Sequence, residues 1–150
     1  MALNPEFVGR VYPPGESYVV GREKIREFAR AIGDTSPACH DVAAARALGY
    51  ADLVAPPTFA VVISLQSSGA VVRDPELGLD YSRVVHGEQG FEYRRPIVAG
   101  DELVVSTTIE TIRTMAGNDM ITTRGDIATV EGEPVVTTRA LLVARGPEEG

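Results

Sequence analysis

The sequence has few of the side chains that most often carry chemistry in proteins. Its 150 residues include one cysteine, two histidines, a single lysine and no tryptophan. One cysteine excludes an internal disulfide and is typical of a protein in a reducing compartment. The histidines, His40 and His86, lie far apart in the chain, and neither belongs to a cluster of other metal-binding residues. We therefore expect neither a metal ion nor a cofactor.

Positive charge and long hydrophobic runs are also scarce. Fourteen Lys and Arg against 21 Asp and Glu give a formal net charge of −7. This balance disfavours a nucleic acid or an anionic membrane as the main partner. No run of about 18 apolar residues occurs, so no segment is expected to span a membrane. Residues 1–15 lack the charged and then apolar leader of a secretory signal, and we expect a soluble cytoplasmic protein.

The periodic segments predict helices in the first half of the chain. In residues 22–32, apolar side chains recur three and four positions apart, which is typical of one buried helix face. A shorter helix is expected over residues 42–48, with Asp41 as its N-cap. Residues 58–71 form the third predicted helix. It is apolar on most sides, as a helix buried in the middle of a domain would be.

Strands are expected in the second half, over residues 84–95, 102–115, 120–130 and 134–145. Short turns between the last three imply antiparallel neighbours. The fold class is therefore α+β, with an antiparallel sheet wrapped around a long central helix. We expect one domain over residues 1–150, with an N-terminal segment at 1–15 and a flexible tail at 146–150. The helix would have one open side, which a symmetric partner could cover.

Three blocks of sequence resemble a known family. They read FARAIGDTSPACHD (Phe28–Asp41), LGYADLVAPPTF (Leu48–Phe59) and VHGEQGFEYRRPIVAGD (Val85–Asp101). In this order they resemble the MaoC-like (R)-specific dehydratases and hydratases. The nearest likeness is to the substrate-binding subunits of heterodimeric (3R)-hydroxyacyl carrier-protein dehydratases. The resemblance implies the hotdog fold and action on an acyl thioester.

In the catalytic members an aspartate and a histidine hold and activate one water molecule, so the resemblance implies Asp34 and His40 as candidate catalytic residues. Asp34 occupies the aspartate position, although it could instead cap the turn after the first helix. Cys39 occupies the family's histidine position, and His40 follows one residue later. Neighbouring side chains point in different directions, so His40 could instead be an exposed histidine before Asp41.

The resemblance also indicates substrate-binding candidates. The family's usual His-Gly is replaced by Pro56-Pro57, and proline has no N–H to donate to a thioester oxygen. Thr58 or Phe59 could donate instead, because the first N–H groups of a helix have no partner within it. We therefore expect Pro57, Thr58 and Phe59 at the site. His86 is a further candidate, although a strand histidine is more often structural.

These departures leave several functions open. The first is the acyl-binding subunit of a (3R)-hydroxyacyl-thioester dehydratase in fatty-acyl metabolism, with a related subunit supplying the catalytic pair. Alternatives are a self-sufficient homodimeric enoyl-thioester hydratase and a non-enzymatic acyl-CoA-binding protein. A hotdog thioesterase is disfavoured, because residues 58–72 contain no Asp or Glu. The expected partners are an acyl-CoA or acyl-carrier-protein thioester, and a second subunit in a homodimer or a heterodimer.

Overall fold

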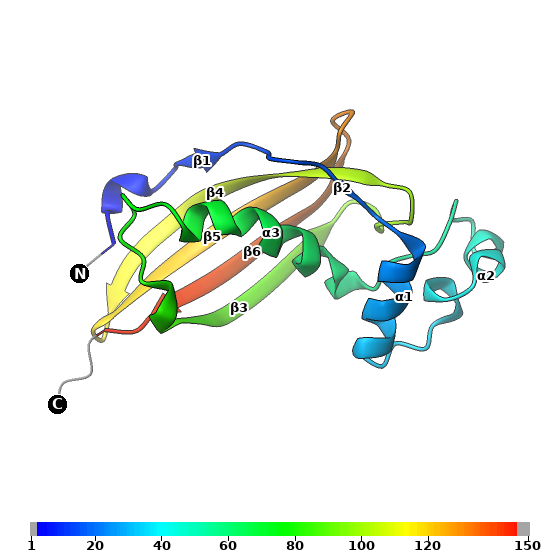
Figure 1. Ribbon diagram of the computed structural model, residues 1–150, viewed down its shortest axis with the longest axis horizontal. Helices are drawn as coiled ribbons and strands as arrows, with labels where there is room; N and C mark the ends of the chain where they lie inside the picture. Colours follow the sequence, from blue (N-terminus) through cyan, green and yellow to red (C-terminus); the bar gives the residue numbers. More distant parts are fainter. Residues whose placement is uncertain (1–2, 147–150) are drawn as a thin grey trace.

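Helix α3 (Ala60–Val72) lies against one face of a six-stranded antiparallel sheet (Figure 1). The structure, a computed structural model, describes residues 3–146. Most of the sheet is formed by β3 (Val84–Tyr93), β4 (Glu102–Met115), β5 (Asn118–Thr129) and β6 (Pro134–Ala144). The strand order is β1-β4-β5-β6-β3, where β1 is the short strand Val11–Tyr12, so β3 lies at an edge. The predicted α+β layout of an antiparallel sheet around one long helix is confirmed.

The long strands form because their apolar and polar residues alternate, and a sheet with one face on a helix buries every second side chain. In β4 the buried side chains are Leu103, Val105, Thr107 and Ile109. Strands β4 and β5 are joined by a two-residue turn. Its central residues are Ala116 and Gly117, with φ of 51° and 76°. A two-residue hairpin turn of this kind needs positive φ at both positions, which glycine adopts easily.

The N-terminal segment is more structured than the sequence indicated. Two short strands, β1 (Val11–Tyr12) and β2 (Tyr18–Val19), both pair with β4. Residues 9–20, here called the strap, thus run along the β4 edge of the sheet beside α3 (Figure 1). Strands of two residues are too short to give a periodic pattern, and for this reason the sequence did not predict them.

Helix α3 is less enclosed than its apolar composition predicted. Ala60, Ile63 and Val71 are buried, but Leu65 is 54% exposed. Polar contacts also lie between the helix and the sheet, where Ser67 Oγ is 3.1 Å from Thr107 Oγ1. The sheet covers one side of the helix only, which agrees with the open side that the sequence predicted. The opposite side, which carries Leu65, is open in the single chain.

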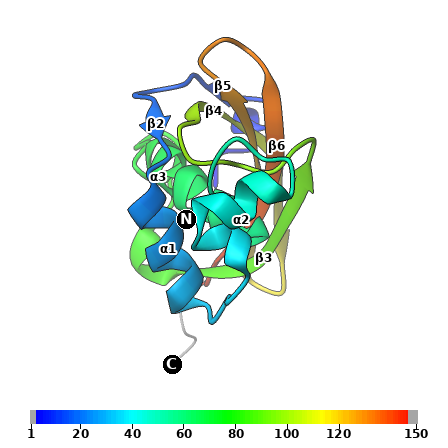
Figure 2. The ribbon, with the colours of Figure 1, turned by 90° about the vertical axis from the view of Figure 1, so that its right-hand side faces the viewer.

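The remaining helices pack together at one end of the sheet (Figure 2). They are α1 (Arg22–Ala31) and α2 (Val42–Ala47), with short 3₁₀ turns η2 (Pro37–Cys39) and η3 (Pro57–Phe59). The other 3₁₀ turns are η1 (Pro5–Phe7) and η4 (Tyr81–Arg83). Between residues 3 and 146, no helix has the length and hydrophobicity needed to cross a membrane. The expected flexible tail falls mostly on residues 147–150, outside the described residues.

Candidate functional site

A cavity of about 460 Å³ lies between the loop after α1, the segment before α3 and the end of β3. Its walls come from three sequence blocks that are far apart in the chain. The first contributes Asp34, Ser36, Ala38 and Cys39, the second Val54, Ala55, Pro56 and Pro57, and the third Tyr93, Arg94, Arg95 and Pro96. These are parts of the three blocks that carried the family resemblance.

Asp34 both closes the turn after α1 and lines the cavity. Its backbone N–H donates to the carbonyl of Ala29 over 2.8 Å, directly after Gly33, whose φ is 72°. Its Oδ1 accepts the N–H of Ser36 over 2.9 Å. The two roles weighed from the sequence are therefore compatible. One carboxylate oxygen holds the turn, and the other, Oδ2, faces Cys39.

Cys39 lies beside this carboxylate. Its side chain is buried, and Sγ is 3.9 Å from Oδ2 of Asp34. Burial, followed by the negative charge of Asp34, raises the pKa of the Cys39 thiol. A thiolate is the nucleophilic form of cysteine, so a raised pKa makes this sulfur a poor nucleophile and a poor base at neutral pH. The thiol acts here as a weak donor to the carboxylate.

His40 is turned away from the cavity. Its Nε2 lies 2.8 Å from the backbone carbonyl oxygen of Asp34, and its own carbonyl accepts Nε of Arg26 over 3.0 Å. Cys39, in the 3₁₀ turn η2, lines the cavity, whereas His40, the residue after this turn, does not. The imidazole thus ties the loop to itself and is not a wall of the cavity.

Tyr93 fixes the other side of the cavity. Its hydroxyl donates to the carbonyl of Pro57 over 2.5 Å, which ties the end of β3 to the segment before α3. Burial raises the pKa of Tyr93 to about 12, so the hydroxyl keeps its proton at neutral pH. The alternation of β3 places this side chain on the helix-facing side of the sheet, but the sequence motifs did not identify it as a site residue.

The other predicted substrate-binding residues lie elsewhere, apart from Pro57. Thr58 is exposed and is not a wall of the cavity. Phe59 is fully buried in the core, with its ring edge-on to Phe28 at 5.4 Å between centroids. His86 is exposed on β3 and borders a separate crevice of about 30 Å³ beneath α3. The structure thus brings together Asp34, Cys39 and Pro57.

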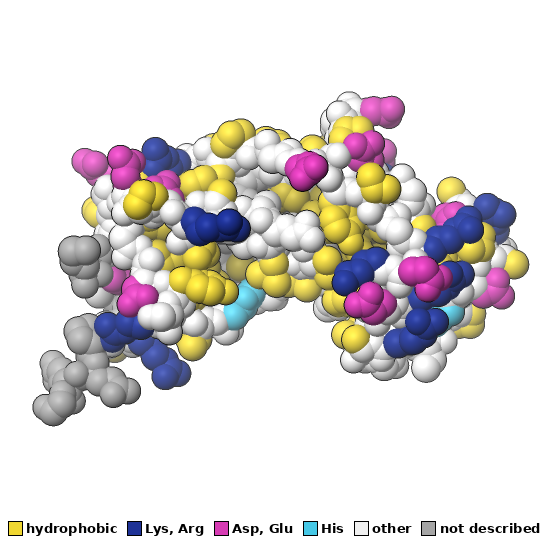
Figure 3. Space-filling view, viewed as in Figure 1, with side chains coloured by type: hydrophobic (Ala, Val, Ile, Leu, Met, Phe, Trp, Pro, Cys, Tyr) yellow, Lys and Arg dark blue, Asp and Glu magenta, His cyan; other side chains and the backbone are white. Residues whose placement is uncertain are grey.

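Most of the basic residues near this end of the molecule are paired. Arg95 donates to both carboxylate oxygens of Asp101, at 2.9 and 3.0 Å, and to Glu133 at 2.6 Å. Arg22 is paired with Asp52 at 2.7 Å. Over α1 and α2, side chains of both charges are mixed (Figure 3). Among residues 3–146, no group of three or more His, Cys, Asp and Glu side chains could hold a metal ion.

The family of the chain follows from its sequence matches. The family model described as the FAS1-like dehydratase domain region matches residues 6–138, and the chain therefore belongs to this dehydratase family. A UPF0336 protein of Streptomyces griseus is 60% identical over 149 residues, which cover 99% of each chain. A UPF0336 protein of Thermobifida fusca is 51% identical over 146 residues, covering 97% of this chain and 96% of the other.

Solved structures agree with this assignment. A MaoC-like dehydratase superposes with a TM-score of 0.87 and 38% identity over 95% of this chain, which spans only 43% of that protein. The C-terminally truncated HadBC (3R-hydroxyacyl-ACP dehydratase) complex from Mycobacterium tuberculosis gives a TM-score of 0.83 and 31% identity. That match covers 91% of this chain and 96% of the other. The resemblance to MaoC-like dehydratases and the hotdog fold are thereby confirmed.

Proposed function

We propose that the chain is the acyl-binding subunit of a (3R)-hydroxyacyl-thioester dehydratase and depends on a related subunit for catalysis. The observation that carries the proposal is the pairing of Asp34 with Cys39 in a cavity that neither histidine of the chain lines. Dehydration removes an α-proton and the β-hydroxyl of the acyl group as one water molecule, so it needs a base and an acid. A carboxylate beside a neutral thiol is a poor substitute for an aspartate–histidine pair.

The cavity suits the binding part of this role. Its volume of about 460 Å³ is within the range of small-ligand sites. Ala38, Val54, Ala55 and Pro56 supply apolar walls for an acyl group. The polar walls Asp34, Tyr93 and Arg95 are held by hydrogen bonds, which suits orientation of the thioester end.

The open surfaces of the chain support a subunit role. Strand β3 lies at the edge of the sheet, and no strand among residues 3–146 pairs with its outer side. Leu65 on α3 is exposed next to that edge, bordering the same crevice as His86. A related subunit could pair with β3 and cover α3 at once. HadBC, to which the chain is similar, is itself a complex.

The first test is the hydration of crotonyl-CoA, the reverse reaction, by the purified chain. We expect no rate above background for the chain alone and a rate when a related catalytic subunit is added. Substantial activity of the chain alone that is lost in Asp34→Asn would support the self-sufficient hydratase instead. Binding of acyl-CoA without activity in any combination of subunits would support a non-enzymatic acyl-CoA-binding protein.

A gain-of-function variant tests directly whether the cysteine beside Asp34 is the reason the chain lacks activity alone. Cys39→His places an imidazole at the family's histidine position, against Asp34, and we expect it to give the chain measurable hydratase activity. Cys39→Ala is the matched control, because it removes the thiol without adding a base. If Cys39→His folds and binds acyl-CoA but stays inactive, Cys39 is not the reason that the chain alone has no hydratase activity.

We place this activity in the cytoplasm. The support is the single buried thiol of Cys39, which suits a reducing compartment. The carrier of the acyl group is either coenzyme A or an acyl carrier protein. The ion pairs of Arg22 and Arg95 reduce the positive charge available for docking an acidic carrier protein. Comparing acyl-CoA with acyl carrier protein in the same assay separates the two.

A further inference from the structure

A second cavity, of about 440 Å³, lies on the other flank of α3, between that helix, the strap and β4. It shares no wall with the cavity around Asp34. Small or apolar groups form much of the lining, namely Pro13, Gly15, Gly69, Ala70 and Val105. The polar walls are Tyr12, Gln66, Ser67, Thr107 and Arg73. Neither the dehydratase family nor the proposed acyl site accounts for it.

Arg73, the residue after α3, supplies positive charge to this cavity. Its Nε donates to the carbonyl of Gly69 over 3.1 Å, which folds the side chain back along the helix. Within residues 3–146 the guanidinium forms no ion pair, and Nη1 and Nη2 make no hydrogen bond. Two parallel N–H groups on one edge of a guanidinium match the two oxygens of a carboxylate.

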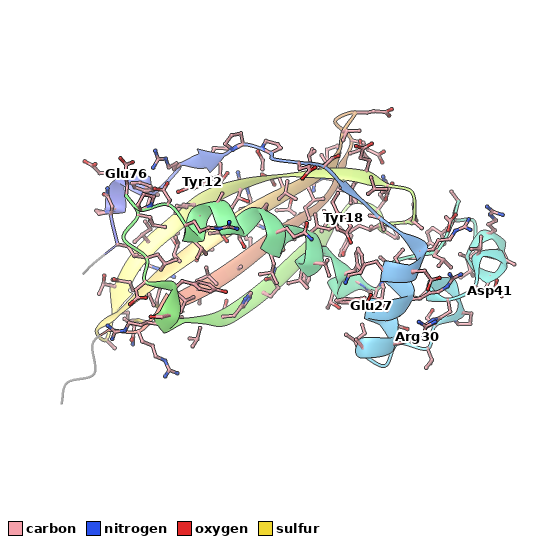
Figure 4. The ribbon with its side chains drawn as sticks, viewed as in Figure 1. Tyr12, Tyr18, Glu27, Arg30, Asp41 and Glu76 are labelled. Carbon is pink, nitrogen blue, oxygen red and sulfur yellow. The ribbon has the colours of Figure 1, made fainter. Side chains whose placement is uncertain are left out.

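Two acidic groups near this cavity, Asp74 and Glu76, are already engaged, whereas Glu16, next to the wall residue Gly15, is exposed. Asp74 accepts the Tyr12 hydroxyl over 2.9 Å and Nη1 of Arg10 over 3.3 Å. Glu76 lies 3.8 Å from the same Arg10 nitrogen. Figure 4 shows Tyr12 on the strap and Glu76 in the loop after α3, at the same end of the molecule. Arg10 therefore offsets the negative charge that would otherwise compete for Arg73.

We propose that this cavity binds a small organic carboxylate, with the carboxylate on Arg73 and the apolar body between the strap and α3. Pro13 and Gly15 form part of the wall, and strap residues 13–16 lie between β1 and β2 without ladder pairing to β4, whereas Ser17 donates to Glu102 of β4 over 2.6 Å. Residues 13–16 can therefore move to admit a ligand more easily than the paired residues on either side. The site is separate from the proposed acyl-thioester site and does not depend on it.

Gly69 offers a way to displace the guanidinium without removing its charge. A Cβ at this position would lie 2.5 Å from Nη2 of Arg73, and the three nearest atoms all belong to that side chain. Alanine is also favoured over glycine inside a helix. Gly69→Ala should therefore leave the fold intact and push the guanidinium away from its present position.

The test is a two-dimensional amide NMR titration of the whole chain with hexanoate, with hexanamide as the uncharged analogue. We expect hexanoate to shift the amides of strap residues 15–17 and of residues 66–73, with little effect from hexanamide. Arg73→Gln and Gly69→Ala should each weaken hexanoate binding at least about tenfold, since hydrogen bonds to charged groups are the stronger ones. Arg113→Gln, which removes an exposed arginine on β4, should bind hexanoate like the wild type.

Three outcomes overturn the proposal. They are no shift at the strap and α3, shifts confined to the cavity around Asp34, and unchanged affinity in both Arg73→Gln and Gly69→Ala. Matching urea midpoints of the variants and the wild type establish that any lost binding is not lost folding. Because Asp34 and Cys39 are far from this cavity, failure here leaves the acyl-binding proposal untouched, and the reverse is also true.

Discussion

A single hydroxyl group, that of Tyr93, joins the last residue of β3 to the segment that precedes α3. The bond to the carbonyl of Pro57 is short, at 2.5 Å, and the ring is part of the wall of the cavity around Asp34. Pro56 and Pro57 supply no N–H, so the hydroxyl of Tyr93 adds to the backbone bonds that Ala55 and Phe59 make on either side of them. The tyrosine thus sets the distance between two walls of the candidate site.

We expect Tyr93→Phe to lower the free energy of unfolding by about 1 kcal/mol, because the carbonyl of Pro57 loses its partner while the ring keeps its packing. Acyl-CoA affinity should fall in parallel as the wall loosens. Urea unfolding and calorimetric titration measure the two effects. Tyr81→Phe removes a hydroxyl from an exposed side chain and should change neither. Equal effects of both substitutions would contradict the assignment.

The ion pair of Asp52 makes part of the stability depend on pH. The hydrogen bond from Arg22, followed by that from the backbone N–H of Leu53, lowers the pKa of Asp52 to about 2. A carboxyl group whose pKa is lower in the folded state stabilises the fold above its unfolded value of 3.8, and that contribution is lost as pH falls toward 2.

Asp52→Asn should therefore be less stable than the wild type at pH 6, with a gap that narrows as the pH falls below about 4. Asparagine can still accept the N–H of Leu53, so the variant isolates the charge. Urea midpoints measured across this pH range give the result. Glu131→Gln, in the loop between β5 and β6, serves as the control and should show no such gap. A gap that stays constant with pH would argue against the ion pair.

At the scale of secondary-structure elements, α2 is a helix of only six residues, and we expect its stability to depend on the hydrogen bond to its N-cap side chain. Asp41 accepts the N–H of Ala43 over 2.9 Å, as its sequence position before an alanine-rich run predicted. Asp41→Ala should cost about 1 kcal/mol of unfolding free energy, whereas Asp41→Ser should keep most of it because serine also caps. Thermal unfolding ranks the three proteins, and equal losses in both variants would exclude capping as the cause.

How far the sequence predicted the elements depended on their length. The four long strands, α1 and α3 were predicted to within a few residues because each has several turns or alternations of pattern, and α2 was predicted from its N-cap Asp41 and its alanine-rich run. The two-residue strands β1 and β2 were missed. The sequence predicted that α3 has an open side but not which residues lie on it. Leu65 and Ser67 have the same local sequence context, yet Leu65 is exposed and Ser67 contacts the sheet.

The residues of the candidate site could also be predicted only in part. Asp34 and Cys39 could be placed together because they belong to one short block and its spacing resembled a family motif. Tyr93, Arg94 and Arg95 were missed as cavity walls, because their approach depends on how β3 ends against the start of α3. Contacts between segments far apart in sequence follow from the sheet register, which no single block contains.

At the scale of the whole molecule, the exposed face of α3 and the β3 edge are expected to lie in one interface. Leu65→Glu should abolish association of the chain with itself or with a related catalytic subunit, because an unpaired charge would be buried there. Gln66→Glu adds the same charge at the neighbouring exposed position. Gln66 lines the second cavity, on the other flank of α3 beside the strap, so this variant should still associate. Sedimentation velocity, with each subunit alone and mixed, distinguishes the two, and association of Leu65→Glu would exclude this face.

The two edges of the sheet differ, and this difference limits how many molecules can associate through them. Along β4 the strap covers part of the edge with two short strands, whereas β3 has no neighbouring strand on its outer side within residues 3–146. A sheet that is open on both sides could add molecules without end, as fibrils do. With one edge obstructed, edge-to-edge pairing ends after a single addition. If the chain associates through β3, we expect the strap to limit edge-to-edge pairing to two molecules.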